Sequence, residues 1–175
     1  SNYINTRHNI GFKIIDAINS HFKLSKQKPK FKGLLTTGNI DQKKIYAIKP
    51  LTFMNNSGTA IKELIDYFKI DAKDVFVFHD DMDIDFGKIK AKFGGSSAGH
   101  NGIESIDKFI GKDYSRVRIG IGHPKKKKKV NNHVLEDFKE DEEEKINEIT
   151  GNVVKQLPTL IEKKIDLFSS KVNQD

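Results

Sequence analysis

Four short polar clusters interrupt the apolar pattern of this chain, and each lies where an expected strand or loop leads into the next element. Together they supply imidazole, carboxylate and side-chain amide groups but no thiol, because the sequence contains no cysteine. Such groups can accept a proton from water and donate hydrogen bonds to an oxyanion. The clusters are Thr6-Arg7-His8-Asn9, Phe53-Met54-Asn55-Asn56-Ser57-Gly58, His79-Asp80-Asp81-Met82-Asp83 and Gly99-His100-Asn101-Gly102.

His8 is the candidate proton acceptor of the first cluster. An unperturbed imidazole has a pKa near about 6.5, so it can take a proton from water at neutral pH. A single histidine just before a helix is also typical of a helix cap or of an ordinary surface position. Asp80, after an apolar run, can orient an imidazole through a hydrogen bond. The aspartates around Asp80 can alternatively hold Mg²⁺ or form a solvated turn, and their spacing leaves all three possibilities open.

Two asparagines carry a more unusual signal, since each lies close to a glycine near the start of an expected helix. Asn55 precedes Gly58, and Asn101 precedes Gly102. A side-chain amide can donate to a developing oxyanion and can accept from a water molecule or an amine. An asparagine in this place can also be a simple N-cap, which would be ordinary at both positions.

The charge balance favours a polyanionic partner. The 175 residues include 31 Lys and Arg against 24 Asp and Glu, a net charge of +7. Phosphates release counterions when lysine and arginine bind them, although a lysine-rich surface without a partner would give the same composition. If the strands that carry them are neighbours, four basic residues form a patch for nucleic-acid phosphates: Lys90, Lys92, Arg116 and Arg118.

Apolar periodicity predicts strands that alternate with helices. Helices are expected over 10–22, 57–69 and 101–110, and a helical C-terminal segment over about 140–172, broken at Gly151 and Pro158. Strands are expected over 34–40, 43–48, 75–78, 88–93 and 117–121, the first two joined by an Asp41-Gln42 turn. This order predicts one α/β domain over 1–175, with three layers and helices on both faces of a mixed, mostly parallel sheet. No apolar run approaches the roughly 20 residues that span a bilayer, so no membrane partner is expected.

The motifs as a set resemble those of bacterial-type peptidyl-tRNA hydrolase. The resemblance runs in order from Tyr3 to about Phe138, and no single motif carries it. Its residues are Tyr3, Thr6-Arg7-His8-Asn9, Gly11-Phe12, Lys49-Pro50, Phe53-Met54-Asn55, Ser57-Gly58, His79-Asp80-Asp81-Met82-Asp83, Gly94-Gly95, Gly99-His100-Asn101-Gly102, Arg116-Val117-Arg118-Ile119-Gly120-Ile121-Gly122-His123-Pro124 and Val134-Leu135 with Phe138.

The resemblance implies an esterase that uses no metal or cofactor and cleaves the ester between a peptide and the ribose at the tRNA 3′ end. His8 matches the catalytic base, Asp80 the carboxylate that orients it, and Asn55 and Asn101 the amides that place the substrate and steady the tetrahedral intermediate. Other matching positions are Tyr3, Met54 and His100 for substrate binding, and Lys92 and Arg118 for the tRNA phosphates. The family also implies a cytoplasmic monomer whose partner is peptidyl-tRNA.

One departure from the family pattern concerns the start of the chain. The family begins with a buried strand that ends in Gly-Leu-Gly-Asn-Pro-Gly just before the tyrosine, whereas this sequence starts at Ser1-Asn2-Tyr3. We expect that first strand to be missing from this chain. Two other functions compete with the hydrolase: a non-catalytic RNA-binding protein on the same scaffold, and a metal-dependent phosphoesterase that uses Asp80, Asp81 and Asp83.

Overall fold

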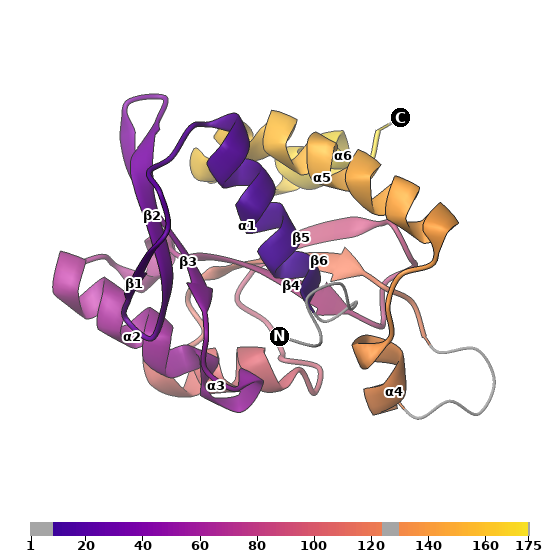
Figure 1. The fold of residues 1–175 in the computed structure, drawn as a ribbon, viewed down its shortest axis with the longest axis horizontal. Helices are drawn as coiled ribbons and strands as arrows, with labels where there is room; N and C mark the ends of the chain where they lie inside the picture. The colour runs from indigo at the N-terminus through magenta and orange to yellow at the C-terminus, as the bar shows by residue number, and fades with distance from the viewer. Residues whose placement is uncertain (1–8, 124–129, 175) are drawn as a thin grey trace. The chain divides into compact units, whose positions relative to one another are not determined.

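The structure, a computed structural model, describes residues 9–123 and 130–174. The described chain forms two compact units (Figure 1). Unit 1 takes residues 9–17, 77–92, 116–123 and 130–174, and unit 2 takes residues 18–76 and 93–115. Within the described residues, none of the helices is long and apolar enough to cross a membrane.

Unit 2 contains an antiparallel sheet of three strands in the order β1-β2-β3. The strands are β1 (Lys28–Lys30), β2 (Gly33–Ile40) and β3 (Lys43–Pro50). The expected hairpin of β2 and β3 is confirmed, with Ile40 opposite Lys43 across the Asp41-Gln42 turn. Both turn residues have positive φ, which matches the twist of a two-residue hairpin. The basic segment before it, over residues 28–30, supplies β1.

The helices of unit 2 follow the predicted apolar stripes. A 3-10 helix, η2 (Met54–Asn56), leads into α2 (Ser57–Phe68), and α3 (Asn101–Ile110) lies against α2 (Figure 1). A further 3-10 turn, η3 (Ala72–Asp74), precedes the next strand. The buried face of α2 carries the predicted apolar residues Ala60, Ile61, Leu64 and Ile65. Tyr46 of β3 stacks on Phe68 at the end of α2, with ring centroids 4.0 Å apart, and so joins the sheet to the helix.

The second sheet lies mostly in unit 1 and has the order β4-β6-β5. Its strands are β4 (Phe76–Asp81), β5 (Ile89–Phe93) and β6 (Ser115–Gly120). Ser115 N donates to Val75 O and Ile121 N donates to Asp81 O, so β4 and β6 run parallel. Gly94 N donates to Tyr114 O and Gly120 N donates to Lys88 O, so β5 and β6 run antiparallel.

The apolar run before His79 suits, from its sequence, a strand buried on both faces, but the structure shows otherwise. Residues 75–78 are half-buried, whereas the polar residues at the end of β4 are buried. Among the described strands, β4 stands at the edge of its sheet, next to β6 alone. An edge strand has one neighbour instead of two, so its apolar side chains are covered less completely.

Helices pack against this sheet in unit 1. Gly11, near the start of α1 (Ile10–His21), lies so close to the carbonyl of Phe78 in β4 that a methyl group at this position would collide with it.

The C-terminal helices are α4 (Val130–Leu135), α5 (Glu140–Ile161) and α6 (Ile165–Val172). The predicted breaks at Gly151 and Pro158 are wrong, because α5 continues through both positions. Its buried stripe spans them, from Ile146 to Leu160, and this packing outweighs the lost backbone hydrogen bond at proline.

Side chains of α6 satisfy the backbone of β5. Asn173 donates from Nδ2 to Ile89 O at 2.7 Å and accepts from Ile89 N at 2.9 Å. Ser169 Oγ accepts from Ala91 N at 2.9 Å. These contacts take the place of a further strand, since they pair the backbone groups on the side of β5 that faces away from β6.

Replacing Asn173 should therefore destabilise the fold. In Asn173→Ala, both backbone groups of the buried Ile89 lose their partner, which costs about 1–3 kcal/mol per group where water cannot replace it. Urea unfolding followed by circular dichroism measures the change. The matched control is Gln174→Ala at the exposed next position, which should leave the unfolding midpoint unchanged. Equal midpoints for the two variants would contradict this role of Asn173.

Candidate functional site

The polar end of β4 carries the candidate site residues of unit 1. His79, Asp80 and Asp81 are all buried, and Asp80 is only 4% exposed. His79 Nδ1 lies 2.9 Å from the carbonyl oxygen of Asp80. A buried carboxylate is stable only where charges or hydrogen bonds compensate its lost hydration. Asp80 is thus held in a desolvated position at the carboxyl end of a strand, where ligands of α/β proteins bind.

The neighbouring aspartates pair with basic side chains of unit 1. Arg118 Nε donates to Asp81 Oδ2 at 2.9 Å, and the other oxygen of Asp81 accepts from Asp83 N at 2.9 Å. Asp83 Oδ1 in turn lies 2.9 Å from His123 Nε2. These contacts, from Arg118 through Asp81 and Asp83 to His123, connect the loop after β4 to β6 and to the loop that follows β6. Across the described residues, these carboxylates do not gather with others into a group of three metal ligands.

Arg118 is placed to bind a further anion. Its side chain is 29% exposed, and the ion pair with Asp81 uses Nε, which leaves the two terminal nitrogens for another partner. β5 and β6 are neighbours, as the predicted basic patch requires. Lys92 of β5 is exposed, but Arg116 is 2% exposed, so its predicted place in an accessible patch is wrong. The strand that carries Arg116 lies in the middle of its sheet, and both of its neighbours help to bury this side chain.

Two predicted site residues and the lysine run lie outside the described residues. These are His8, Tyr3 and residues 125–129. The segment that follows His8 is described: Gly11 packs on Phe78, two residues before Asp80. The sequence motifs that contain His8 and Asp80 are therefore connected through the packing of α1 on β4.

In unit 2, the structure brings together two motifs that lie far apart in the sequence. A methyl group on Gly102 would lie 2.6 Å from Met54 Sδ, so the first turn of α3 rests directly on η2. A methyl group on Gly58 would collide with the backbone oxygen of Ser105, and Gly58 N donates to Ser105 Oγ at 2.9 Å. The absence of side chains at these two glycines permits the contact that places the Asn55 and Asn101 motifs side by side.

The two asparagines are not helix caps. His100 caps α3, because its Nδ1 accepts from Gly102 N at 3.1 Å and from Ile103 N at 3.2 Å. The helix α2 starts after Asn56, and Ser57 Oγ donates to Met54 O at 2.9 Å. The side chains of Asn55 and Asn101 are exposed, and neither makes a hydrogen bond to another described residue. Both amides are accordingly open to a ligand.

Sequence reasoning missed several residues that hold these motifs in place. Ser105 received no role, although a small polar residue on the buried face of an apolar helix is itself a signal of a specific contact. Asp81 was considered as a metal ligand or turn residue, and its pairing with Arg118 was not expected. The pairing of His123 with Asp83 has no signal in the sequence, because 40 residues separate them.

Comparisons with known proteins show which family the chain resembles. A family model described as peptidyl-tRNA hydrolase matches residues 1–175. A peptidyl-tRNA hydrolase of Pelagibacter ubique is 73% identical over 169 residues, which cover 97% of this chain and 91% of that protein. One from Ehrlichia ruminantium is 44% identical, with 95% of this chain and 86% of that protein covered. The crystal structure of peptidyl-tRNA hydrolase from Acinetobacter baumannii has a TM-score of 0.91 at 31% identity, covering 99% of this chain and 89% of that one.

These matches define the class of the protein as a hydrolase with an α/β fold, and the expected fold class is confirmed. The chain belongs to the peptidyl-tRNA hydrolase family, and the resemblance inferred from its motifs is confirmed.

The two glycines that hold the unit 2 motifs together should respond differently to a methyl group. Gly58→Ala meets backbone atoms that cannot move aside, so it should lower the free energy of unfolding by about 1–3 kcal/mol, as overpacking does. Gly102→Ala meets the end of a flexible methionine, so its cost should be smaller. Gly151→Ala, in α5 with no atom near the new methyl, should stabilise the protein by about 0.5–1 kcal/mol. Urea unfolding measures this order, and a Gly58→Ala variant as stable as Gly151→Ala would refute the close packing of α2 and α3.

Proposed function

We propose that this protein hydrolyses the ester bond between the peptide and the tRNA in peptidyl-tRNA. The observation that carries the proposal is the contact between Gly102 and Met54, because the residues next to them in the sequence are Asn101 and Asn55, and both of these side chains are exposed. Two neutral donors, neither used as a helix cap, suit an oxyanion better than a structural role. The relatives described above carry the name of this activity.

His8 acts as the general base in the proposed reaction, and Asp80 orients it. Support comes from the packing of Gly11 on Phe78, since His8 is three residues from Gly11 and Asp80 is two residues from Phe78. The imidazole takes a proton from water while the water oxygen attacks the ester carbonyl carbon. The resulting oxyanion accepts hydrogen bonds from Asn55 and Asn101. Cleavage of the bond to the ribose oxygen then releases the peptide carboxylic acid, and the imidazolium returns its proton to that ribose oxygen, which becomes a hydroxyl group.

The remaining assigned residues bind the substrate. Met54, Tyr3 and His100 contact the peptide end, and Lys92 and Arg118 contact tRNA phosphates. The geometry of Arg118 supports its role, because Asp81 fixes the guanidinium through Nε while its terminal nitrogens can donate in parallel to phosphate oxygens. The pairing of Asp81 and Asp83 with Arg118 and His123 supports a structural role for these carboxylates over metal binding. We further propose that the chain works as a monomeric single domain in the cytoplasm, without a cofactor.

The catalytic proposal predicts that His8→Ala abolishes hydrolysis while tRNA binding persists. Removing a general base lowers turnover by about 10²–10⁴-fold. The assay follows release of peptide from an N-acyl-aminoacyl-tRNA in the presence of EDTA, and binding is measured separately with deacylated tRNA. His21→Ala is the matched control, because His21 is an exposed histidine at the other end of α1.

Each competing function gives a different result in that assay. A wild-type protein that binds tRNA but releases no peptide would favour the non-catalytic RNA-binding alternative. Loss of activity in EDTA would favour a metal-dependent enzyme. Full activity in His8→Ala would remove His8 from the mechanism.

The tRNA-binding proposal predicts a change in salt dependence. Lys92→Ala and Arg118→Ala should each weaken tRNA binding and reduce the slope of log affinity against log salt by about 0.9, the value for one lost phosphate contact. Arg118→Lys should keep the slope but lower the affinity, because one ammonium cannot serve Asp81 and a phosphate at once. The control is Lys155→Ala on the exposed face of α5. If Lys92→Ala and Arg118→Ala gave the same salt slope as Lys155→Ala, these two residues would not contact tRNA phosphates.

A further inference from the structure

Unit 2 carries a cluster of aromatic rings that the proposed reaction does not use. Phe31 from the β1–β2 turn contacts Tyr67 and Phe68 of α2, with ring centroids 5.3 and 5.6 Å apart. Tyr46 of β3 stacks on Phe68. Tyr67 is 63% exposed, and the other three rings are half-buried. The rings thus form a platform that is held by its own packing and has one face in solvent.

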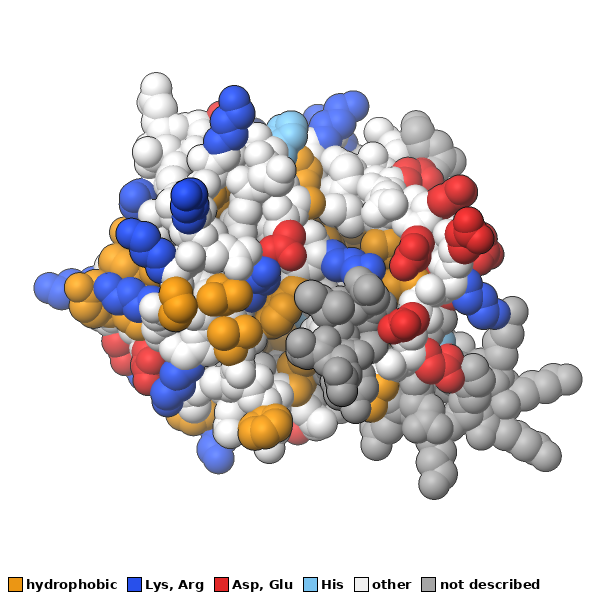
Figure 2. All heavy atoms as spheres, in the orientation of Figure 1, with side chains coloured by type: hydrophobic (Ala, Val, Ile, Leu, Met, Phe, Trp, Pro, Cys, Tyr) orange, Lys and Arg blue, Asp and Glu red, His pale blue; other side chains and the backbone are white. Residues whose placement is uncertain are grey.

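Lysine ammonium groups lie directly over this platform. Lys30 Nζ is 4.5 Å from the ring centre of Tyr67 and 5.1 Å from that of Phe31, and Lys44 Nζ is 5.7 Å from that of Tyr46. We call these six residues the lysine–aromatic surface: Lys30, Phe31, Lys44, Tyr46, Tyr67 and Phe68. Figure 2 shows lysine and hydrophobic side chains interleaved on the left side of the view, where Figure 1 places β1 and α2.

The positive charge of this surface is not neutralised locally. Lys28 lies two residues before Lys30 and so faces the same side of β1. Among the described residues, Lys28, Lys30 and Lys44 form no ion pair with a carboxylate. The acidic residues of α2 are already paired, Glu63 with Lys32 and Asp66 with Lys62. Three ammonium groups are accordingly available to an anion.

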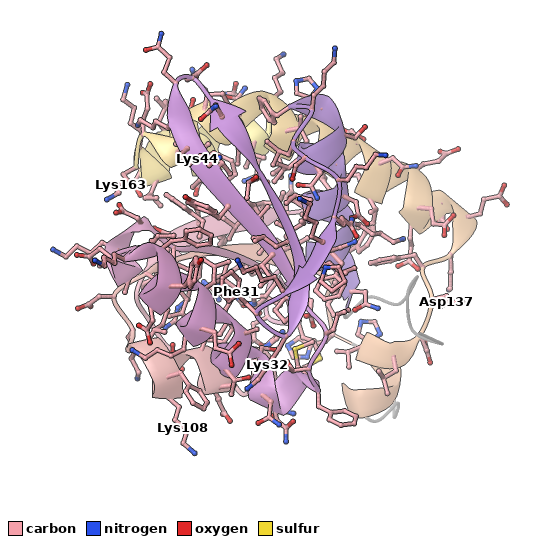
Figure 3. The ribbon with its side chains drawn as sticks, turned by 60° about the vertical axis from the view of Figure 1, so that its left-hand side comes forward. Phe31, Lys32, Lys44, Lys108, Asp137 and Lys163 are labelled. Carbon is pink, nitrogen blue, oxygen red and sulfur yellow. The ribbon has the colours of Figure 1, made fainter. Side chains whose placement is uncertain are left out.

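The backbone holds Phe31 in place at a conformational cost. Phe31 and Lys32 have φ values of 54° and 57°, in the left-handed region that bulky residues rarely adopt. The two-residue turn between β1 and β2 demands this conformation, and asparagine or glycine would satisfy it with less strain. Strain of this kind is typical of positions where a side chain is needed for function. Figure 3 labels Phe31, Lys32 and Lys44 on the hairpin sheet, with Lys108 apart from them on α3.

We propose that the lysine–aromatic surface, together with the neighbouring Lys28, is a second RNA contact. It stacks an unpaired base on Tyr67 and binds the flanking phosphates through Lys28, Lys30 and Lys44. Aromatic rings beside basic side chains are how proteins hold single-stranded nucleic acid without reading its sequence. Apart from the stacked pair of Tyr46 and Phe68, the rings meet tilted or edge-on, and these contacts hold the exposed ring of Tyr67 in place for a base. This proposal rests on the proposed function in one respect: the RNA that the surface contacts is the tRNA part of the substrate.

The test compares three variants of the full chain in binding to labelled deacylated tRNA and to a mixed-sequence single-stranded RNA. Lys30→Gln/Lys44→Gln should lower the affinity by about three- to tenfold near 0.1 M salt and reduce the salt slope by about 1.4, or 0.7 for each single-strand phosphate contact. Tyr67→Ala should lower the affinity at least about fivefold without changing the slope. The control, Lys108→Gln/Lys112→Gln, removes two exposed charges of the same unit and should have less than half the effect. Circular dichroism checks that each variant is folded.

Ultraviolet cross-linking locates the contact independently. Nucleotide adducts on peptides that contain Tyr67 or Phe31 would support the proposal. The proposal fails if the double variant and its control lose affinity equally. It also fails if the surface variants bind RNA like the wild type but lose binding to anionic phospholipid vesicles or to polyglutamate.

Failure of this proposal can be told apart from failure of the proposed function. Hydrolysis of a minimal substrate, an N-acyl-aminoacyl ester of adenosine, does not need the lysine–aromatic surface. The Lys30→Gln/Lys44→Gln variant should therefore cleave the minimal ester at the wild-type rate, and a large loss there would overturn the proposal. A wild-type protein that cleaves no ester would refute the hydrolase alone, because the binding comparison still decides the RNA contact.

Discussion

The close approach of α2 and α3 at Gly58 is the constraint on which the candidate site in unit 2 depends. No side-chain atom fits between Gly58 and the backbone of Ser105, and the serine hydroxyl fills the one remaining hydrogen-bonding position. Because both helices begin near this contact, their first turns meet at Met54 and Gly102. Backbone packing therefore positions the asparagines beside those residues, while their own side chains make no hydrogen bond to another described residue.

Electrostatic pairing has the same role in unit 1. The end of β4 concentrates carboxylates in a region with little solvent, which is costly unless cations are close. Arg118 of β6 supplies the cation for the buried Asp81, while the exposed Asp83 lies beside the ring of His123 in the loop that follows β6. The pairing fixes the guanidinium of Arg118 as well as the carboxylate of Asp81. Arg118 can therefore compensate the charge of Asp81 and also present its remaining nitrogens to a phosphate.

Local patterns in the sequence identified the elements well, and the errors arose from contacts between distant segments. The Asp41-Gln42 turn and the apolar stripe of α2 could be predicted because each depends on neighbours within a few residues. The burial of Arg116 could not, since it depends on the strand order of a sheet. The break expected at Pro158 failed for a similar reason, because the packing of α5 on both sides of the proline outweighs its local preference.

The candidate site shows the same division. The residue types in the four clusters pointed to a base, a carboxylate and two amides, and the family resemblance assigned their roles. That His100, and not Asn101, caps α3 required knowledge of the backbone geometry, because either residue suits the cap by type. The partners of Asp81 and Asp83 required the pairing of strands that lie far apart in the chain.

The bonds from Asn173 and Ser169 to β5 also bear on how the protein behaves when its C-terminus is damaged. A protease that cuts before Ser169 would remove both side chains and leave a lysine-bearing strand with open backbone groups on one side. An exposed edge of this kind is a template for pairing with another molecule, and only the charges of Lys90 and Lys92 would oppose it. The clipped protein should therefore self-associate more readily in high salt than in low salt, because salt screens the repulsion between these lysines.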